Sequence, residues 1–248
     1  MAENKQSDFS ESTLWRVITF TGHAITLNLL FIASTLPITV LTVLKVMYNS
    51  PLVSILFYIS FAALGPALSA LFTAVRYYLR NDSWFDGFRA GYKNHTLSMA
   101  VISVLLSSFI IYMGDIVFAI AKNFTKNALF SLIPNSLILA VAIALFTSLI
   151  VYNVFFPRRF IDLLTESASF VFKAPLQLLI TGLLLWAPIF VILVYAKYVI
   201  IFIIVFMAVY FSLSAFLGIG LLKDPLIAVL TKKRETGELP PLVKEEED

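Results

Sequence analysis

Six long apolar stretches dominate the chain, and short segments that hold most of the charge separate them. An α-helix rises 1.5 Å per residue, so about 20 apolar residues are enough to cross a hydrocarbon core of about 30 Å. The pattern therefore predicts an all-α, polytopic membrane protein with six transmembrane helices. The expected spans cover about residues 17–44, 51–75, 96–121, 132–157, 174–196 and 198–222.

Two apolar stretches are longer than one straight helix needs to cross the membrane, namely the first span and the combined run of the last two spans. Residues 17–44 exceed one straight crossing, so we expect a tilt or a bend. Pro37 is the expected position of the bend, because proline removes a backbone donor and clashes with the preceding turn. Only Lys197 separates the last two spans, which are counted as two because the combined run is too long for one crossing.

Basic residues concentrate on alternate connections of this arrangement, as expected of cytoplasmic loops. One side keeps four of them, namely Lys45, Lys122, Lys126 and Lys197. The other side holds 14 of the 18, namely Lys5, Arg16, Arg76, Arg80, Arg89, Lys93, Arg158, Arg159, Lys173, Lys223, Lys232, Lys233, Arg234 and Lys244. Both termini are therefore predicted to be cytoplasmic, and five spans would spoil this distribution.

Polar segments flank the expected membrane domain of residues 15–222. Residues 1–14 form a short cytoplasmic segment, and residues 223–248 form an acidic cytoplasmic tail that we expect to be largely disordered. The cytoplasmic loops at 76–95 and 158–173 are long enough for short helices at the membrane interface.

Aromatic and basic residues follow a helical spacing in both cytoplasmic loops. The spacing puts aromatic groups along one side of a short helix, with Arg89 and Lys93 beside them, and these groups are Trp84, Phe85, Phe88 and Tyr92. Such a stripe fits a groove of another protein, or it lies on the inner leaflet against anionic lipid, and both alternatives stay open. The candidate partner contacts are Arg76, Trp84, Phe88, Arg89, Tyr92, Lys93, Phe160 and Leu164.

Small residues form a column along the second span. Gly65, Ser69 and Thr73 recur at steps of four, with Pro66 and Ala70 beside them. Such faces allow membrane helices to approach closely, so helix packing is the favoured role over a substrate groove. Pro66 also predicts a kink in this span.

Isolated polar residues interrupt the apolar spans. Asn28, Asp115, Asn135 and Gln177 either hydrogen-bond between helices or converge on a polar cavity. Asp115 is the sole charge of its span, and it either pairs with lysine at the interface or faces an outward cavity.

Composition narrows the function classes. The chain is 60% hydrophobic and 13% charged, with a mean hydropathy of +0.91, which is outside the range of soluble globular domains. Cysteine is absent, so disulfides and thiolate metal sites are excluded. The formal net charge is +3, but the basic residues do not gather on a single face that could bind nucleic acid.

Motifs for enzymatic chemistry are missing from the sequence. It contains no HExxH, no GxSxG, no phosphate-binding glycine loop and no paired intramembrane aspartates. We therefore expect a protein that is not an enzyme and that needs no cofactor or metal.

Residues 65–76 (GPALSALFTAVR), 84–95 (WFDGFRAGYKNH) and 152–157 (YNVFFP) resemble the YesL-like family of small bacterial integral membrane proteins, a domain of unknown function. In that family, a Gly-Pro-Ala helix ends in an arginine and leads to an acidic and aromatic loop. Genes for such proteins often lie beside carbohydrate ABC transporters.

The resemblance implies an accessory or assembly partner of a carbohydrate ABC import system in the bacterial plasma membrane. Its partners would be membrane lipid and the permease or solute-binding components. Two alternatives stay open. One is a self-contained small-molecule transporter or substrate-binding membrane subunit, and the other is a structural or regulatory protein that acts as a homo-oligomer, packed through the small residues of the second span.

Overall fold

The computed structural model describes residues 13–48, 50–123, 128–156, 160–195 and 200–236. Within these ranges the chain is helical and contains no strand, so the predicted all-α class is confirmed. The elements are α2 (Thr13–Ser34), α3 (Leu36–Tyr48), α4 (Pro51–Ser60), the 3-10 turn η1 (Phe61–Ala63), α5 (Leu64–Tyr78), α6 (Trp84–Lys93), α7 (Thr96–Lys122), α8 (Ala128–Phe155), α9 (Phe160–Lys173), α10 (Pro175–Tyr195) and α11 (Ile200–Glu235).

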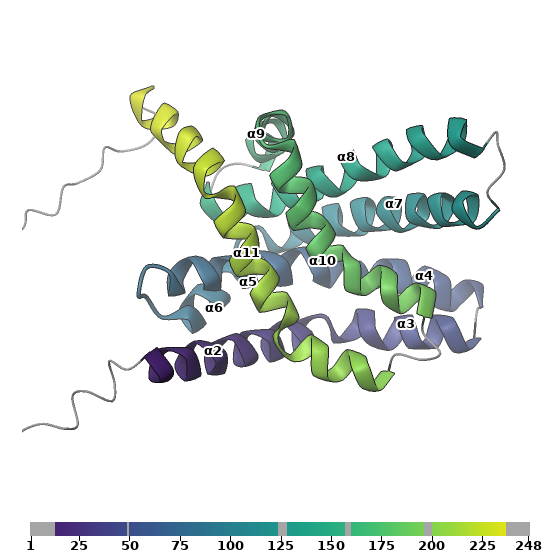
Figure 1. Cartoon of the computed structure of the whole chain (residues 1–248), viewed down its shortest axis with the longest axis horizontal. Helices are drawn as coiled ribbons and strands as arrows, with labels where there is room; N and C mark the ends of the chain where they lie inside the picture. Colours follow the sequence, from purple (N-terminus) through teal and green to yellow (C-terminus); the bar gives the residue numbers. More distant parts are fainter. Residues whose placement is uncertain (1–12, 49, 124–127, 157–159, 196–199, 237–248) are drawn as a thin grey trace, which may run out of the picture.

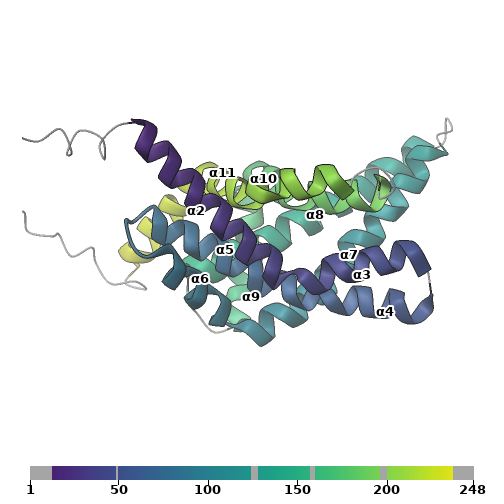
Figure 2. The ribbon, with the colours of Figure 1, turned by 90° about the horizontal axis from the view of Figure 1, so that it is seen from below.

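The long helices run back and forth between two ends of the molecule (Figure 1). The start of α2, the end of α11 and all of α6 lie at one end, which we call the basic end. The turn between α3 and α4 lies at the other end. Figure 2 shows α10 and α11 along one side of the molecule, with α3 and α4 along the other.

Within the described residues, four helical segments are long and apolar enough to cross a membrane, and two bent pairs raise the number to as many as six. The four are residues 51–78, 96–122, 128–155 and 210–235. The bent pairs are α2 with α3, which meet at 59°, and α9 with α10, which meet at 107°. The predicted number of six lies at the upper end of this range.

The bend predicted in the first span is confirmed. It occurs at Thr35, between α2 and α3, and Pro37 is the second residue of α3. Proline fits the first turn of a helix because its missing N–H would have no partner there. The second span is also irregular, since η1 interrupts the helix shortly before Pro66.

Helix α5 is the centre of the molecule. Every residue from Leu64 to Val75 is buried, and α2, α6, α7, α8 and α11 pack around it. Aromatic rings fill the core beside it, where the buried Trp186 of α10 lies 5.7 Å from Phe146 and 6.3 Å from Phe61 between ring centroids.

Large apolar side chains also cover the outer surface. Leu105 of α7 and Ile133 and Leu137 of α8 are each about two thirds exposed. A soluble monomer rarely exposes a continuous apolar surface, whereas lipid favours one. This surface and the long apolar helices fit a multi-pass membrane protein.

The polar tail expected from residue 223 begins as a helix, and the disorder expected after about Thr231 is contradicted as far as Glu235. Helix α11 continues through Pro225 to Glu235. Leu222, Leu226 and Val229 are buried at helical spacing, so packing stabilises the helix beyond the point where the sequence becomes polar. The rest of the tail lies outside the described residues.

Candidate functional site

Helix α6 folds back onto α5 through two glycines. A Cβ atom at Gly91 would lie 2.5 Å from Thr73 Oγ1 and 2.7 Å from the Ser69 carbonyl oxygen. A Cβ atom at Gly87 would lie 2.8 Å from Tyr77 Cγ. Both helices therefore approach more closely than any other residue type permits, which makes α6 a fixed element of the basic end.

The seating of α6 determines which of its side chains are accessible. Phe88 is only 8% exposed and packs into the core, while Trp84 and Tyr92 are partly buried against it. Arg89 and Lys93 are exposed. Of the partner contacts predicted on this helix, Arg89 and Lys93 are therefore accessible. Phe88 points inward, because its side of the helix is covered by α5.

Phe85, an aromatic residue of this loop that is not among the predicted partner contacts, is 53% exposed on the same helix. Its position follows from the helical period, because it lies four residues before Arg89 and on the side opposite the two glycines. Together, Phe85, Arg89 and Lys93 form what we call the α6 outer face.

Arg76 is engaged within the chain. Its Nη1 donates a hydrogen bond to the Val154 carbonyl oxygen at 2.6 Å, and its guanidinium lies 5.0 Å from the ring centroid of Phe155. A cation at the last turn of a helix satisfies a free carbonyl and opposes the negative end of the helix dipole. Arg76 therefore joins α5 to the end of α8, and its role as a partner contact is not supported by its position.

A hydrogen-bonded junction lies beside Arg76. Asn153 of α8 donates through Nδ2 to Ser69 Oγ of α5 at 3.1 Å, and Asn94 donates to the Asn153 carbonyl oxygen at 3.1 Å. Ser69 and Asn153 are buried. We call Ser69, Arg76, Asn94 and Asn153 the polar junction, where the three strings of the family resemblance meet.

The small-residue column of α5 packs inside the chain. A Cβ atom at Gly65 would lie 1.9 Å from Ser103 Oγ and 2.7 Å from the Met99 carbonyl oxygen of α7. The remaining members predicted for helix packing, namely Pro66, Ser69, Ala70 and Thr73, are all buried. Neighbouring helices of the same chain cover this face, so it is not open to a second copy.

The predicted polar cavity is not formed by its four candidates. Asn28 is buried in α2, where its Oδ1 accepts a hydrogen bond from the Ser212 backbone N–H at 3.1 Å. Asn135 donates to the Ser131 carbonyl oxygen of its own helix at 2.7 Å. Asp115 is exposed and Gln177 is half-buried. In the described part of the chain, no hydrogen bond or ion pair joins any two of these four residues.

Helix α9 presents two faces at a steep angle to α10. Leu163, Ser167 and Phe170 are buried, and Ser148 Oγ of α8 donates to the Ser167 carbonyl oxygen at 2.7 Å. Leu164, a predicted partner contact, is 38% exposed beside Ile161 at 76%. Phe160 begins the helix, and its side chain lies outside the described residues.

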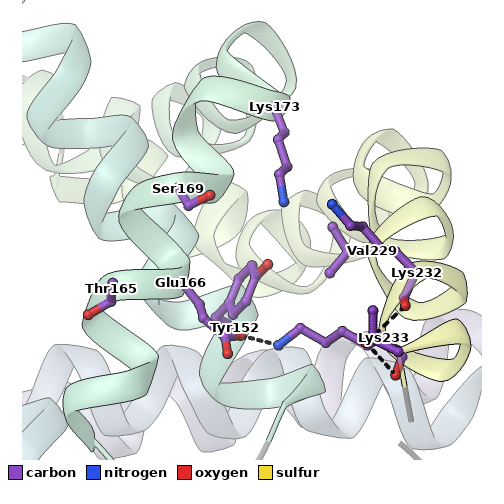
Figure 3. Close-up of a pocket in the computed structure, with 9 residues that line it drawn as sticks. Tyr152, Thr165, Glu166, Ser169, Lys173, Val229, Lys232 and Lys233 are labelled. Atoms are coloured by element: carbon purple, nitrogen blue, oxygen red, sulfur yellow. Dashed lines mark hydrogen bonds and ion pairs between the residues drawn. The ribbon is translucent and has the colours of Figure 1, made fainter. Parts of the chain in front are cut away.

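A pocket of about 270 Å³ separates α9 from the end of α11 (Figure 3). We call it the α9–α11 pocket. Its lining combines three lysines with one carboxylate and several hydroxyl groups. The lining residues are Tyr152, Thr165, Glu166, Ser169, Lys173, Val229, Lys232, Lys233 and Thr236.

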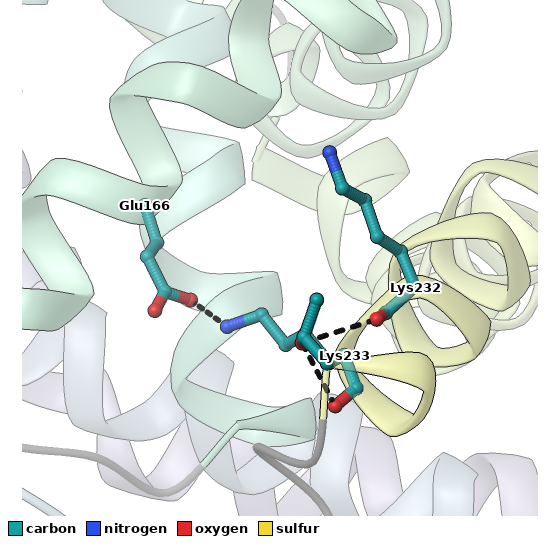
Figure 4. A network of polar contacts seen from close by, with 4 residues as sticks. Glu166, Lys232 and Lys233 are labelled. Carbon is teal, nitrogen blue, oxygen red and sulfur yellow. Dashed lines mark hydrogen bonds and ion pairs between the residues drawn. The ribbon is translucent and has the colours of Figure 1, made fainter.

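Glu166 and Lys233 form an ion pair that bridges the two helices of the pocket (Figure 4). Lys233 also lies 5.0 Å from the ring centroid of Phe156, so the cation contacts an aromatic face as well as a carboxylate. The sequence does not predict this pair, because its two residues are far apart along the chain and no local motif connects them.

The described residues contain no group of three or more histidine, aspartate or glutamate side chains arranged to hold a metal ion. The accessible groups described above are of kinds that bind partners or ligands. They are the exposed cations and the aromatic ring on α6, and the ammonium and hydroxyl groups in the α9–α11 pocket.

Comparison with known proteins adds no relative. No protein-family model matches the chain, and neither a curated protein nor a solved structure matches it significantly. The resemblance to the YesL-like family therefore stays a prediction.

Proposed function

We propose that this protein is a non-enzymatic membrane protein that acts by docking another membrane protein on the α6 outer face. The observation that supports the proposal is that one short helix is packed closely on α5 by one face and presents accessible side chains on the opposite face. Gly87 and Gly91 hold α6 against α5, while Phe85, Arg89 and Lys93 point away from that contact.

This combination suits a binding surface for two reasons. Aromatic and arginine side chains are enriched at the energetic centres of interfaces. A helix that is already ordered also loses little conformational freedom on binding, so more of the contact energy appears as affinity.

The resemblance to the YesL-like family suggests the partner that docks on α6, the permease of a carbohydrate ABC importer, whose cytoplasmic loops lie on the same side of the membrane. The distribution of basic residues supports a cytoplasmic position for α6, with both termini on the same side of the bacterial plasma membrane. In this proposal, the protein assists assembly or regulation of the importer and does not itself move the sugar.

The test is affinity capture of the tagged protein from its native membrane in mild detergent, followed by mass spectrometry. We expect importer subunits in a fixed ratio. The variant Arg89→Glu with Lys93→Glu should reduce their recovery about tenfold, because reversed charges oppose a complementary surface. Membrane insertion of the variant is verified by extraction with carbonate.

A matched control keeps the total charge change equal. Arg80→Glu with Lys223→Glu reverses two exposed basic residues outside the α6 outer face and should leave recovery unchanged. Recovery of the protein alone, or equal recovery with Arg89→Glu and Lys93→Glu in place, would refute docking at α6.

A further inference from the structure

Two ammonium groups share the α9–α11 pocket without a carboxylate between them. Lys173 ends α9 and Lys232 lies near the end of α11, and Figure 3 shows both side chains turned toward the same opening. Among the described residues, the ion pair of this pocket joins Glu166 to Lys233, and neither Lys173 nor Lys232 forms one. Like charges at close range repel unless an anion lies between them.

The ion pair leaves the pocket positively charged. Three lysines and one glutamate give 3 − 1 = 2 net positive charges in the lining. Lys233 is held by Glu166 and by the ring of Phe156, so it forms a wall of the pocket, whereas Lys173 and Lys232 are exposed and can move to a ligand.

The uncharged groups of the pocket suit an oxyanion. Ser169 contributes a hydroxyl group from α9, whereas the hydroxyl group of Thr165 donates to the Ile161 carbonyl oxygen of its own helix. Hydroxyl and ammonium donors together match the several acceptor oxygens of a phosphate group. The volume of about 270 Å³ is roughly nine times that of one liquid water, which leaves room for a phosphate with part of the molecule that bears it.

The surroundings of the pocket are consistent with a position at the level of lipid headgroups. α9 meets α10 at 107°, as expected of a helix that lies along a membrane surface while α10 enters the bilayer. Its exposed side chains include Ile161, Leu164 and Phe172, the last of them 87% exposed, and these apolar groups suit the boundary of the acyl chains.

We propose that the α9–α11 pocket binds a phosphate monoester group, presented by the headgroup of an anionic phospholipid or by a small soluble ester, through Lys173 and Lys232. Basic pockets between membrane helices are known to hold anionic headgroups. The proposal is independent of partner docking at α6, because it uses different helices and different residues.

The experiment uses the full chain, purified in mild detergent, and follows binding by native mass spectrometry. Dioctanoyl phosphatidic acid is the lipid probe, dioctanoyl phosphatidylcholine is the matched lipid without net charge, and glycerol 3-phosphate is the soluble probe. We expect phosphatidic acid to bind and phosphatidylcholine not to bind. Competition by glycerol 3-phosphate at similar concentration would identify a soluble ester as the source, and its failure to compete would identify the lipid.

Variants test whether these two lysines are responsible. Lys173→Gln with Lys232→Gln should weaken phosphate binding about 30-fold, which corresponds to about 2 kcal/mol at 1.4 kcal/mol per tenfold. The control Lys122→Gln with Lys223→Gln removes the same charge from exposed positions outside the pocket and should change binding less than about twofold.

Lys173→Arg with Lys232→Arg should retain binding, since guanidinium also recognises phosphate. This variant also separates loss of charge from loss of fold, together with a monomer peak in gel filtration for every protein. Equal affinity for phosphatidic acid and phosphatidylcholine, an unchanged affinity in the double glutamine variant, or an equal loss in its control would each overturn the proposal.

Discussion

The two loop helices, α6 and α9, share a sequence pattern and differ in how the rest of the chain holds them. Both are short, amphipathic and preceded by arginines. α6 is seated on α5 through Gly87 and Gly91 at distances that exclude any side chain. α9 buries Phe170 and leaves Ile161 exposed, and a charged pocket separates it from α11.

This difference shows that amphipathicity alone does not decide the role of a loop helix. A glycine pair converts one face of α6 into a contact with its own chain, so only the opposite face can meet a partner. α9 lacks glycine, keeps a wider separation from α11, and retains both an apolar stripe and a polar pocket. The rigid helix suits docking, and the open one suits ligand binding.

The largest effect on stability is expected from a side chain added at the close contact between α6 and α5. Gly91→Ala places a methyl group against Thr73 Oγ1 and the Ser69 carbonyl oxygen, and we expect a loss of about 2 kcal/mol in the free energy of unfolding. Unfolding by SDS in mixed micelles measures it. Gly220→Ala is the control, because nothing lies within 4 Å of a Cβ atom there, and it should be neutral or stabilising by up to about 1 kcal/mol. Equal effects of the two changes would contradict a close seat.

A smaller effect is expected at the polar junction, which supports that seat. Asn153→Ala removes the hydrogen bond to Ser69 Oγ, and we expect a loss of about 1 kcal/mol by the same measurement. Asn135→Ala removes an amide that bonds only within its own helix, so its effect should be within about 0.5 kcal/mol. If Asn153→Ala and Asn135→Ala change the free energy of unfolding equally, the polar junction does not stabilise the protein.

The smallest effect on stability is expected at the α9–α11 pocket. Glu166→Gln removes the ion pair with Lys233, but the glutamine amide oxygen can still accept a hydrogen bond from the ammonium group, which also keeps its contact with the ring of Phe156. We expect a loss of less than about 1 kcal/mol. A loss as large as that of Gly91→Ala would show that α9 is held as firmly as α6, and the contrast between the two helices would fail.

Much of the fold follows from local sequence. The length of each apolar stretch predicts how many helices can span a membrane, and Pro37 predicts the bend in the first span. Both predictions depend on backbone geometry alone. The spacing of Trp84, Phe88 and Tyr92 predicts a short helix, and α6 forms there. These features need no knowledge of which helices become neighbours.

The sites do depend on neighbours, which explains why the sequence predicted them less well. Asn94 and Asn153 meet only because α6 and α8 pack on the same helix. Lys232 joins the α9–α11 pocket because α11 continues past Pro225, where the polar sequence suggested an end. Phe88 was selected for its spacing, but the glycines beside it turned that face toward α5.

The burial of α5 has a consequence for how the protein is made. The helices that pack on α5 come from both sides of it in the chain, since α2 precedes it and α6, α7, α8 and α11 follow it. Gly65 lies against α7, and Ser69 is bonded to Asn153 of α8. The centre of the protein is therefore complete only when nearly the whole chain has been synthesised, because α11 is the last helix of the described residues.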